Sequence, residues 1–194
     1  MDSAVTPFRV VLADPPWRFG DRLPGPGRGA SKHYRTMTTR DICALRLPPI
    51  AEDALLFLWR VSAMQADALD VVHAWGFALK SELVWVKTAA AGSRENGRMG
   101  MGRYVRLDHE VCLIGVRGRG AQLVTDHGVR SVVYAPRGPH SAKPGAAYDA
   151  IEKLTAGVGP RLELFARRAR PGWECWGSDL GVEIGFGLLG GIHG

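Results

Sequence analysis

Four consecutive residues near the start of the chain combine a carboxylate, two imides and a large aromatic ring. Asp14, Pro15, Pro16 and Trp17 directly follow an apolar run at 8–13. The prolines lack a backbone N–H and stiffen the segment, so carbonyl oxygens stand beside the Asp14 carboxylate as acceptors. Acceptors without nearby donors suit an amino group, and an indole can stack on the ring that carries it. The tetrapeptide therefore predicts a site for the exocyclic amine of a base; a strand-ending turn with a core tryptophan is the alternative.

The same contacts would activate the amine. Asp14 and the Pro15 carbonyl can each accept one of its two hydrogens, which favours a pyramidal nitrogen whose lone pair attacks an electrophilic methyl group. That attack needs no separate base beforehand. We therefore take Asp14, Pro15, Pro16 and Trp17 as the candidate catalytic residues.

The elements that must position this tetrapeptide alternate between strands and helices. Short apolar runs predict buried strands at 8–13, 54–59, 79–87, 110–116, 129–134 and 161–165. Helices are expected to begin at Thr38 or Thr39, at Ser62 and at Pro144, and to run toward Leu45, Gly76 and Leu154. This alternation predicts an α/β fold with a mostly parallel sheet, helices on both faces, and ligands beyond the carboxyl ends of the strands.

Length and composition limit the classes of protein. The 194 residues are 46% hydrophobic and 23% charged, typical of one globular domain; we expect that domain over 1–180 and a glycine-rich tail over 181–194. No apolar run approaches the roughly 20 residues of a membrane span, and the start lacks a signal-peptide pattern. Cys43, Cys112 and Cys175 are far apart, so neither a disulfide framework nor a metal cluster is expected, and the cytoplasm is the natural setting.

Positive charge is concentrated in two segments and indicates an anionic partner. The net charge is +6, and the segments at about 18–33 and 88–107 each carry four basic side chains against one acidic side chain. Both contain several glycines, which predicts loops. Contact with nucleic acid is one explanation, and an ordinary solvated surface is the other. The candidate contacts are Arg18, Arg28, Lys32, Arg94, Arg98, Arg103 and Arg106.

Several motifs in a fixed order carry a family resemblance over roughly 10–180. They are DPPW (14–17), HYRTM (33–37), LLFLW (55–59), LVWVK (83–87), HEVCLIGVRG (109–118), HSAKPGAAYDAIEKL (140–154) and LELFARR (162–168). In these stretches the chain resembles the DPPW-type adenine methyltransferases, the MT-A-seventy family. The resemblance implies methylation of the N6 amine of adenine in nucleic acid by S-adenosylmethionine. It also implies a Rossmann-like class I methyltransferase fold with permuted motif order, the catalytic motif preceding the cofactor motifs.

The resemblance also implies which residues hold the cofactor. Asp14 would accept a hydrogen bond from its ammonium, and Glu163 would bind its ribose hydroxyls. Lys143 stands at the start of an expected helix, where an ammonium and free backbone donors can hold a carboxylate; in the family this is the carboxylate of the cofactor. Phe165 and Arg167 lie in the LELFARR stretch that contacts the cofactor. An exposed lysine and a surface arginine are the alternatives for Lys143 and Arg167.

Two positions depart from the family pattern. An Asn-Gln pair near the cofactor ribose is common in the family, whereas this chain has Ser178 and Asp179, which we keep as candidate cofactor contacts. Tyr34 and Trp17 are candidate walls of the adenine pocket, with core packing as the alternative for each. Glu110 shows no pattern that separates it from ordinary packing or solvation.

The sequence leads us to expect an adenine-N6 methyltransferase of nucleic acid. DNA is favoured over RNA, because a compact chain without an accessory domain resembles bacterial or phage enzymes. A catalytically silent nucleic-acid-binding partner is the alternative, although its tetrapeptide would usually be degraded. A small-molecule or protein amine is a third substrate class, against which the two basic segments argue. Pairing with a second copy or a related chain is expected from the habit of the family.

Overall fold

The structure is a computed structural model, and it describes residues 6–18, 36–91, 93–95, 104–138 and 142–181. These residues form one seven-stranded sheet in the order β5-β3-β4-β2-β1-β6-β7. The strands are β1 (Phe8–Ala13), β2 (Ile50–Arg60), β3 (Ala78–Thr88), β4 (His109–Arg117), β5 (Val132–Pro136), β6 (Arg161–Leu164) and β7 (Glu174–Trp176). All neighbours are parallel except that β4 runs antiparallel to β2 and β3. The expected α/β fold with a mostly parallel sheet is confirmed.

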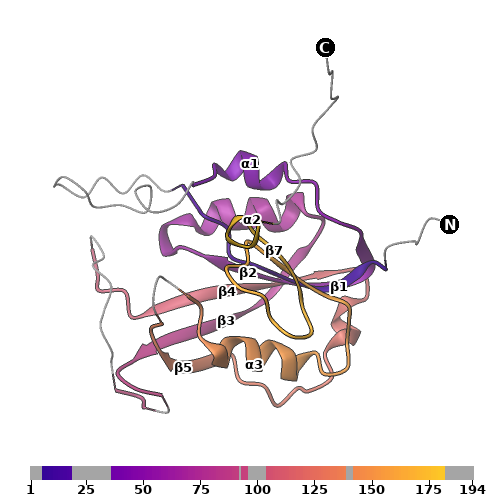
Figure 1. The fold of residues 1–194 in the computed structure, drawn as a ribbon. Coiled ribbons are helices and arrows are strands. Elements are labelled where there is room, and N and C mark those ends of the chain that lie inside the picture. Colours follow the sequence, from indigo (N-terminus) through magenta and orange to yellow (C-terminus); the bar gives the residue numbers. More distant parts are fainter. Residues whose placement is uncertain (1–5, 19–35, 92, 96–103, 139–141, 182–194) are drawn as a thin grey trace.

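Helices cover both faces of the sheet, as predicted. Figure 1 shows α1 and α2 on one side of the strands and α3 on the other. Their bounds are Thr39–Cys43 for α1, Gln65–Ala74 for α2 and Gly145–Leu154 for α3, and short 3₁₀ turns occur at η2 (Ser62–Met64), η3 (Gly120–Leu123) and η5 (Ser178–Leu180). α1 begins with the expected threonine cap: the Thr38 hydroxyl accepts from the Asp41 N–H, and the Asp41 carboxylate accepts in return from the Thr38 N–H.

Several predicted boundaries were wrong for local reasons. Pro144 is the cap before α3 rather than its first helical residue, because its ψ of 146° is extended. β6 ends at Leu164, since Phe165 adopts a φ of +63° that a strand does not accommodate. β5 begins at Val132 instead of 129, and β2 extends back to Ile50. β7 was not predicted, because its three partly exposed residues form no apolar run.

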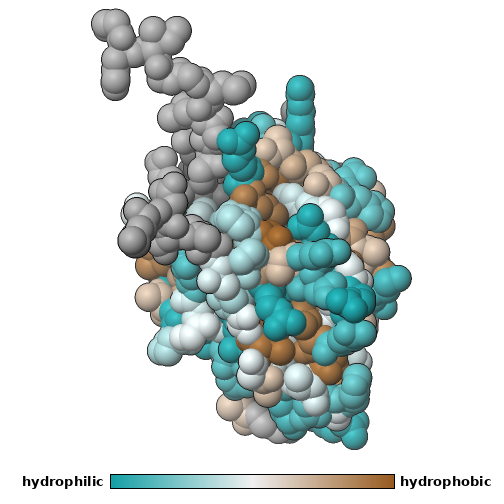
Figure 2. All heavy atoms as spheres, turned by 90° about the vertical axis from the view of Figure 1, so that its right-hand side faces the viewer, coloured by the Kyte–Doolittle hydropathy of each residue, from teal (hydrophilic) through white to brown (hydrophobic). Residues whose placement is uncertain are grey.

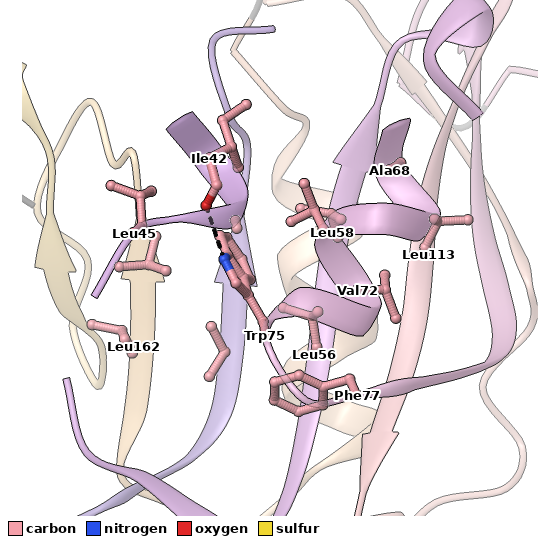
Figure 3. Close-up of a cluster of buried hydrophobic side chains, with 14 of the residues drawn as sticks. Ile42, Leu45, Leu56, Leu58, Ala68, Val72, Trp75, Phe77, Leu113 and Leu162 are labelled. Carbon is pink, nitrogen blue, oxygen red and sulfur yellow. Dashed lines mark hydrogen bonds between the residues drawn. The ribbon is translucent and has the colours of Figure 1, made fainter. Parts of the chain in front are cut away.

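The alternation of side chains along the strands builds two apolar layers. Along β2, Leu56 and Leu58 pack under α1 and α2, whereas Leu55, Phe57 and Trp59 pack on the α3 side. Trp75, after α2, fills the first layer, and its indole N–H donates to the carbonyl oxygen of Ile42 at 3.0 Å (Figure 3). This bond ties α2 to α1 inside an apolar environment.

The outer surface is mixed in character. On the side of the molecule shown in Figure 2, hydrophilic side chains cover most of the described surface and hydrophobic ones form smaller patches between them. Within the described part of the chain, no helix has the length and apolar content to cross a membrane.

Replacing Trp75 by Phe should destabilise the fold. The substitution removes the indole donor, leaves the Ile42 carbonyl only its longer backbone bond from the Leu45 N–H at 3.3 Å, and removes part of a large buried ring. The free energy of unfolding should fall by about 1–3 kcal/mol in urea titrations. Trp176→Phe is the matched control, because the Trp176 indole donates only to the exposed Glu174 carboxylate at 2.9 Å in the described structure. Equal losses in the two variants would contradict a role for the Trp75 bond.

Candidate active site

Four charged side chains from four elements meet at one end of the sheet. Asp14 directly follows β1, Lys87 lies near the end of β3, and Lys143 directly precedes the Pro144 cap of α3. Glu110 is the second residue of β4, and because β4 runs antiparallel, its start reaches the same edge as the carboxyl ends of its neighbours. Topology therefore gathers residues that are far apart in the sequence.

These four side chains form a continuous row of ion pairs, which we call the ion ladder. The Lys143 ammonium lies 2.8 Å from Asp14 Oδ2 and 3.2 Å from Glu110 Oε2. The Lys87 ammonium lies 2.9 Å from Glu110 Oε1. The two lysine side chains are only 7% and 10% exposed, and the two carboxylates are each 28% exposed. Positive and negative charges alternate, so the ladder has no net formal charge.

Two tryptophans lie beneath the ammonium groups. The Lys143 nitrogen is 5.3 Å from the ring centroid of Trp59, and the Lys87 nitrogen is 5.5 Å from that of Trp85. Both distances suit a cation–π interaction, which stabilises an ammonium that has lost its water. The Trp85 indole is fixed by donating to the Ala135 carbonyl at 2.9 Å. The lysines are thus held by carboxylates at their tips and by aromatic faces alongside.

Burial and ion pairing oppose each other in setting the charges of the ladder. Burial alone would raise the pKa of Glu110, but Lys143 and Lys87 outweigh it, and the pKa is lower than usual. Burial alone would lower the pKa of Lys143, but Asp14 and Glu110 outweigh it, and the pKa is raised. Glu110 and Lys143 are therefore both charged at neutral pH.

The DPPW segment is held firmly against the core. Trp17 is 4% exposed, and its indole N–H donates to the Trp59 carbonyl at 3.0 Å, so its ring lies in the apolar layer. The Pro15 carbonyl already accepts from the Trp17 N–H at 2.8 Å, and the Pro16 carbonyl accepts from the Met37 N–H at 2.8 Å. Each carbonyl oxygen can accept a second bond. The carbonyl acceptors expected beside Asp14 are present, but each already accepts one backbone hydrogen bond.

A second group of polar residues surrounds Glu163 at the end of β6. Because β1 and β6 are parallel neighbours with Leu12 opposite Glu163, this side chain faces α3 beside Asp14. The Tyr148 hydroxyl donates to Glu163 Oε1 at 2.7 Å, and Arg170 lies 3.6 Å from the centroid of the Tyr148 ring. Burial raises the pKa of Glu163 above its usual value, an effect that Tyr148 and Arg170 partly offset. A carboxylate of this kind is preorganised by its own neighbours.

The chain after β6 is shaped by close backbone contacts. Phe165 turns the chain with its positive φ, and the next residue, Ala166, donates its N–H to the Trp176 carbonyl at 3.0 Å. A Cβ on Gly177 would lie 2.0 Å from the Ala166 carbonyl oxygen, so only glycine fits there. Arg167 directly follows Ala166, Ser178 directly follows Gly177, and both side chains are exposed. Asp179 belongs to η5 by its backbone, and its side chain lies outside the described structure.

The candidate nucleic-acid contacts are only partly described. Arg18, Arg94 and Arg106 are exposed, and the Arg94 guanidinium lies 5.2 Å from the ring centroid of Tyr134 at the sheet edge. Arg28, Lys32, Tyr34, Arg98 and Arg103 lie outside the described residues.

Sequence reasoning missed three of the residues that build the site. Glu110 had no recognisable pattern, and Lys87 and Tyr148 were read only as parts of longer motifs. The alternation of side chains along a strand is a usable signal, because residues two apart share a face. Trp85 and Lys87 share one face of β3, and Glu110 shares a face of β4 with the buried Cys112. This alternation identifies Glu110 as a neighbour of Lys87 only once β4 is known to run antiparallel to β3. Among the described residues, no group of three or more His, Cys, Asp or Glu side chains could hold a metal ion.

Comparison with known proteins identifies the family. The model of the MT-A70 family matches residues 8–179, which include β1, the DPPW segment, the ion ladder and Glu163. The chain belongs to the MT-A70 family of methyltransferases. The resemblance inferred from the motifs is thereby confirmed.

Individual relatives differ in how much of their length the chain matches. It is 33% identical over 182 residues to a fruit-fly N(6)-adenosine-methyltransferase MT-A70-like protein, covering 91% of this chain and 28% of the relative. It is 31% identical over 188 residues to the human N(6)-adenosine-methyltransferase catalytic subunit METTL3, covering 94% and 30%. It is 29% identical over 191 residues to the type II methyltransferase M.MunI of a Mycoplasma species, covering 89% and 78%. The chain thus spans under a third of the two adenosine-methyltransferase relatives.

Replacing Lys143 by Met should destabilise the protein in a pH-dependent way. Removing the ammonium leaves two carboxylates facing each other, which should cost about 1.5–3 kcal/mol at pH 7. Because pairing lowers the pKa of Glu110 below 4.5, its stabilising contribution exists above that pH and is lost as the pH falls through the lowered value. The gap between wild type and variant should therefore narrow below pH 4.5 in denaturation experiments.

Lys153→Met is the matched control for this experiment. Lys153 lies on α3 and pairs with Asp126 at 3.5 Å, but its side chain is 65% exposed. Its loss should change the stability by less than about 0.5 kcal/mol. A Lys143→Met effect that stays constant from pH 7 to pH 3 would contradict the ion-ladder explanation.

Proposed function

We propose that this chain transfers a methyl group from S-adenosylmethionine to the N6 amine of adenine in DNA. The observation that carries the proposal is the position of Asp14: it directly follows β1 within the DPPW segment, is bound by Lys143 through Oδ2, and remains partly exposed. Relatives over nearly the whole chain are named N(6)-adenosine-methyltransferases. The geometry of the site and the names of the relatives support the same chemistry.

The residues around Asp14 suit the three polar parts of the cofactor. Glu163 accepts from the Tyr148 hydroxyl through Oε1 and from the Cys175 thiol, a weak donor, through Oε2 at 3.9 Å. The remaining lone pairs of this carboxylate suit two ribose hydroxyls. Asp14 offers an acceptor for the cofactor ammonium. Lys143 uses two of its three protons on Asp14 and Glu110, which leaves the third for the cofactor carboxylate. When bound, S-adenosylmethionine would supply an electrophilic methyl group.

The protein's contribution to the reaction is orientation and hydrogen bonding. Asp14 would accept one hydrogen of the amine, and the second lone pair of the Pro15 carbonyl would accept the other. These bonds direct the nitrogen lone pair away from the acceptors and toward the methyl carbon. The bond from this carbon to the cofactor sulfur would break as the new bond to nitrogen forms, with its electron pair going to the sulfur. The extra proton of the methylated amine would then leave along its hydrogen bond to Asp14 and pass to solvent. Positioning and hydrogen bonds of this kind can account for most of the rate enhancement in a direct displacement. The base must be unpaired to enter, from a single strand or by flipping out of a duplex.

Nucleic acid as the substrate is supported by charge, and DNA by one of the relatives. The net charge of +6 comes from two segments, in which the described residues Arg18, Arg94 and Arg106 are exposed. The type II methyltransferase is matched over 78% of its length, against under a third for the two adenosine-methyltransferase relatives. The intact DPPW and the complete ion ladder favour an active enzyme over a silent binding partner.

We propose that the protein is cytoplasmic and that it pairs with a second copy or a related chain.

Replacing Asp14 by Ala should abolish methyl transfer without unfolding the protein. The variant removes the acceptor for the amine, which should reduce transfer at least about 100-fold. The measurement is transfer from labelled S-adenosylmethionine to adenine-containing DNA and RNA, single- and double-stranded, followed by nucleoside mass spectrometry. N6-methyladenine in the DNA alone would support the proposed substrate.

Asp70→Ala is the control, because Asp70 is exposed on α2 and lies outside the site. Near-normal transfer by Asp14→Ala would refute the mechanism. A wild-type protein that binds both cofactor and nucleic acid but transfers nothing would instead indicate the silent partner.

Replacing Arg94 by Ala should weaken binding to DNA and reduce its dependence on salt. If Arg94 contacts one phosphate, the slope of log affinity against log salt concentration should decrease by about 0.9 on a duplex. Arg130→Ala is the control, because Arg130 is also exposed but lies before the amino-terminal end of β5, away from the carboxyl ends of the strands. Fluorescence anisotropy at several salt concentrations measures both. Indistinguishable slopes for the two variants would remove Arg94 from the interface.

A further inference from the structure

Lys87 is a buried charge that the proposed chemistry does not use. Its side chain lies at the end of β3, is 7% exposed, and contacts the Trp85 ring and the Glu110 carboxylate. In the described structure it is linked to Asp14 only through Glu110 and Lys143. Burying an ammonium is costly, and replacing it with an apolar side chain would often be neutral for stability. A reason for its presence should therefore be sought in the site.

The two carboxylate oxygens of Glu110, the partner of Lys87, accept from different lysines. Glu110 Oε1 accepts from Lys87 at 2.9 Å, while Oε2 accepts from Lys143 at 3.2 Å. The first bond fixes the rotation of the carboxylate and limits Glu110 to a single oxygen on Lys143. Without Lys87, both oxygens of Glu110 would be able to compete for the same ammonium. Lys143 would then be drawn from Asp14 toward Glu110.

The count of charges adds a second consequence. With Lys87 present, two ammonium groups balance two carboxylates. Without it, the one remaining ammonium faces both Asp14 and Glu110, and the group carries a net charge of −1. Protonation of Glu110 relieves that charge, since burial already opposes the charged form of this carboxyl group. Without Lys87, the pKa of Glu110 should therefore rise, and above that raised pKa a charged Glu110 competes with Asp14 for Lys143.

We propose that Lys87 is a positioning residue for methyl transfer: by holding Glu110, it keeps Lys143 on Asp14 Oδ2 and leaves Asp14 Oδ1 to receive the adenine amine. The part of this inference that concerns methyl transfer rests on the proposed function. The part that concerns the charges of Glu110 and Lys143 rests on the ion ladder alone. The two parts can be tested separately.

Among the described residues, the other titratable groups near Glu110 are accounted for. Lys87 faces it from β3, Lys143 from the segment before α3, and Asp14 from β1 across Lys143. On its own strand, Cys112 is buried with a raised pKa and stays neutral, and the preceding Asp108 and His109 pair with each other at 3.1 Å. In the part of the chain that the structure describes, Lys143 and Lys87 are therefore the cations that lower the pKa of Glu110.

The test compares Lys87→Met with Lys87→Arg. Methionine keeps an unbranched stem against Trp85 but removes the charge, whereas arginine keeps the charge. Lys80→Met is the control, because Lys80 lies on the same strand at its exposed far end. In each protein, the Glu110 carboxyl group is titrated by carbon-13 NMR, and kcat and KM for adenine-containing DNA are measured across pH.

Lys87→Met should raise the pKa of Glu110 and leave KM for DNA unchanged. Above that raised pKa it should reduce kcat about 10- to 100-fold, and the loss should shrink as the pH falls through it, because a neutral Glu110 no longer draws Lys143 from Asp14. Lys87→Arg should restore most of kcat and the Glu110 titration, and Lys80→Met should match the wild type. An unchanged Glu110 titration with wild-type kcat in Lys87→Met would overturn the proposal. So would equal loss of folding in the Met and Arg variants, which is the signature of a purely structural role.

Failure of the proposed function gives a different result. A wild-type protein that methylates no nucleic acid would overturn the methyl-transfer part of the inference and the proposed function together. The Glu110 titration would still respond to Lys87→Met if the ion ladder is as described. The two failures are therefore distinguishable in one set of samples.

Discussion

The site depends on one ammonium group shared by two carboxylates. Lys143 is almost fully buried between Asp14 and Glu110, and each contact is within hydrogen-bonding distance. A buried charge is tolerated only when its partners are held in place, so the surrounding elements must supply rigid attachment points. They do: Asp14 and Glu110 stand at the ends of strands in one sheet, and Lys143 directly precedes the Pro144 cap of α3. The apolar layers on either side of the sheet keep those points fixed.

The antiparallel strand β4 makes this arrangement available. In an entirely parallel sheet, the first residues of a strand lie at the edge opposite the ligand crevice. By running the other way between β2 and β3, β4 brings Glu110 to the carboxyl ends of these strands and places it between Lys87 and Lys143. The direction of β4 could not be read from local sequence patterns, whereas other features could. The fold class, β1 and the α1 cap followed from local patterns, and the family followed from motifs in a fixed order.

The part of the site that the sequence did not predict required long-range pairing. Asp14 and Lys143 were identified as candidates, but their direct contact spans 129 positions and joins two roles that had been considered separately. Glu110 lies in an ordinary strand sequence, and its importance arises only from which strand lies beside it. Trp17 shows the reverse: a residue whose type suggested stacking on a base is 4% exposed, with its indole N–H bound to the Trp59 carbonyl. Tyr148 was hidden similarly, since helical spacing assigns it to a buried face without naming Glu163 as its acceptor.

The proposed binding and the proposed chemistry make different physical demands on this chain. Amine activation requires acceptors placed to a fraction of an ångström, and strand ends backed by two apolar layers provide that precision. Phosphate contact requires charge and reach, which arginines on glycine-rich segments can supply. Arg94 combines features of both: it belongs to a basic segment, yet its guanidinium lies 5.2 Å from the ring centroid of Tyr134 on β5. This contact ties an exposed cation to the same sheet that carries Asp14.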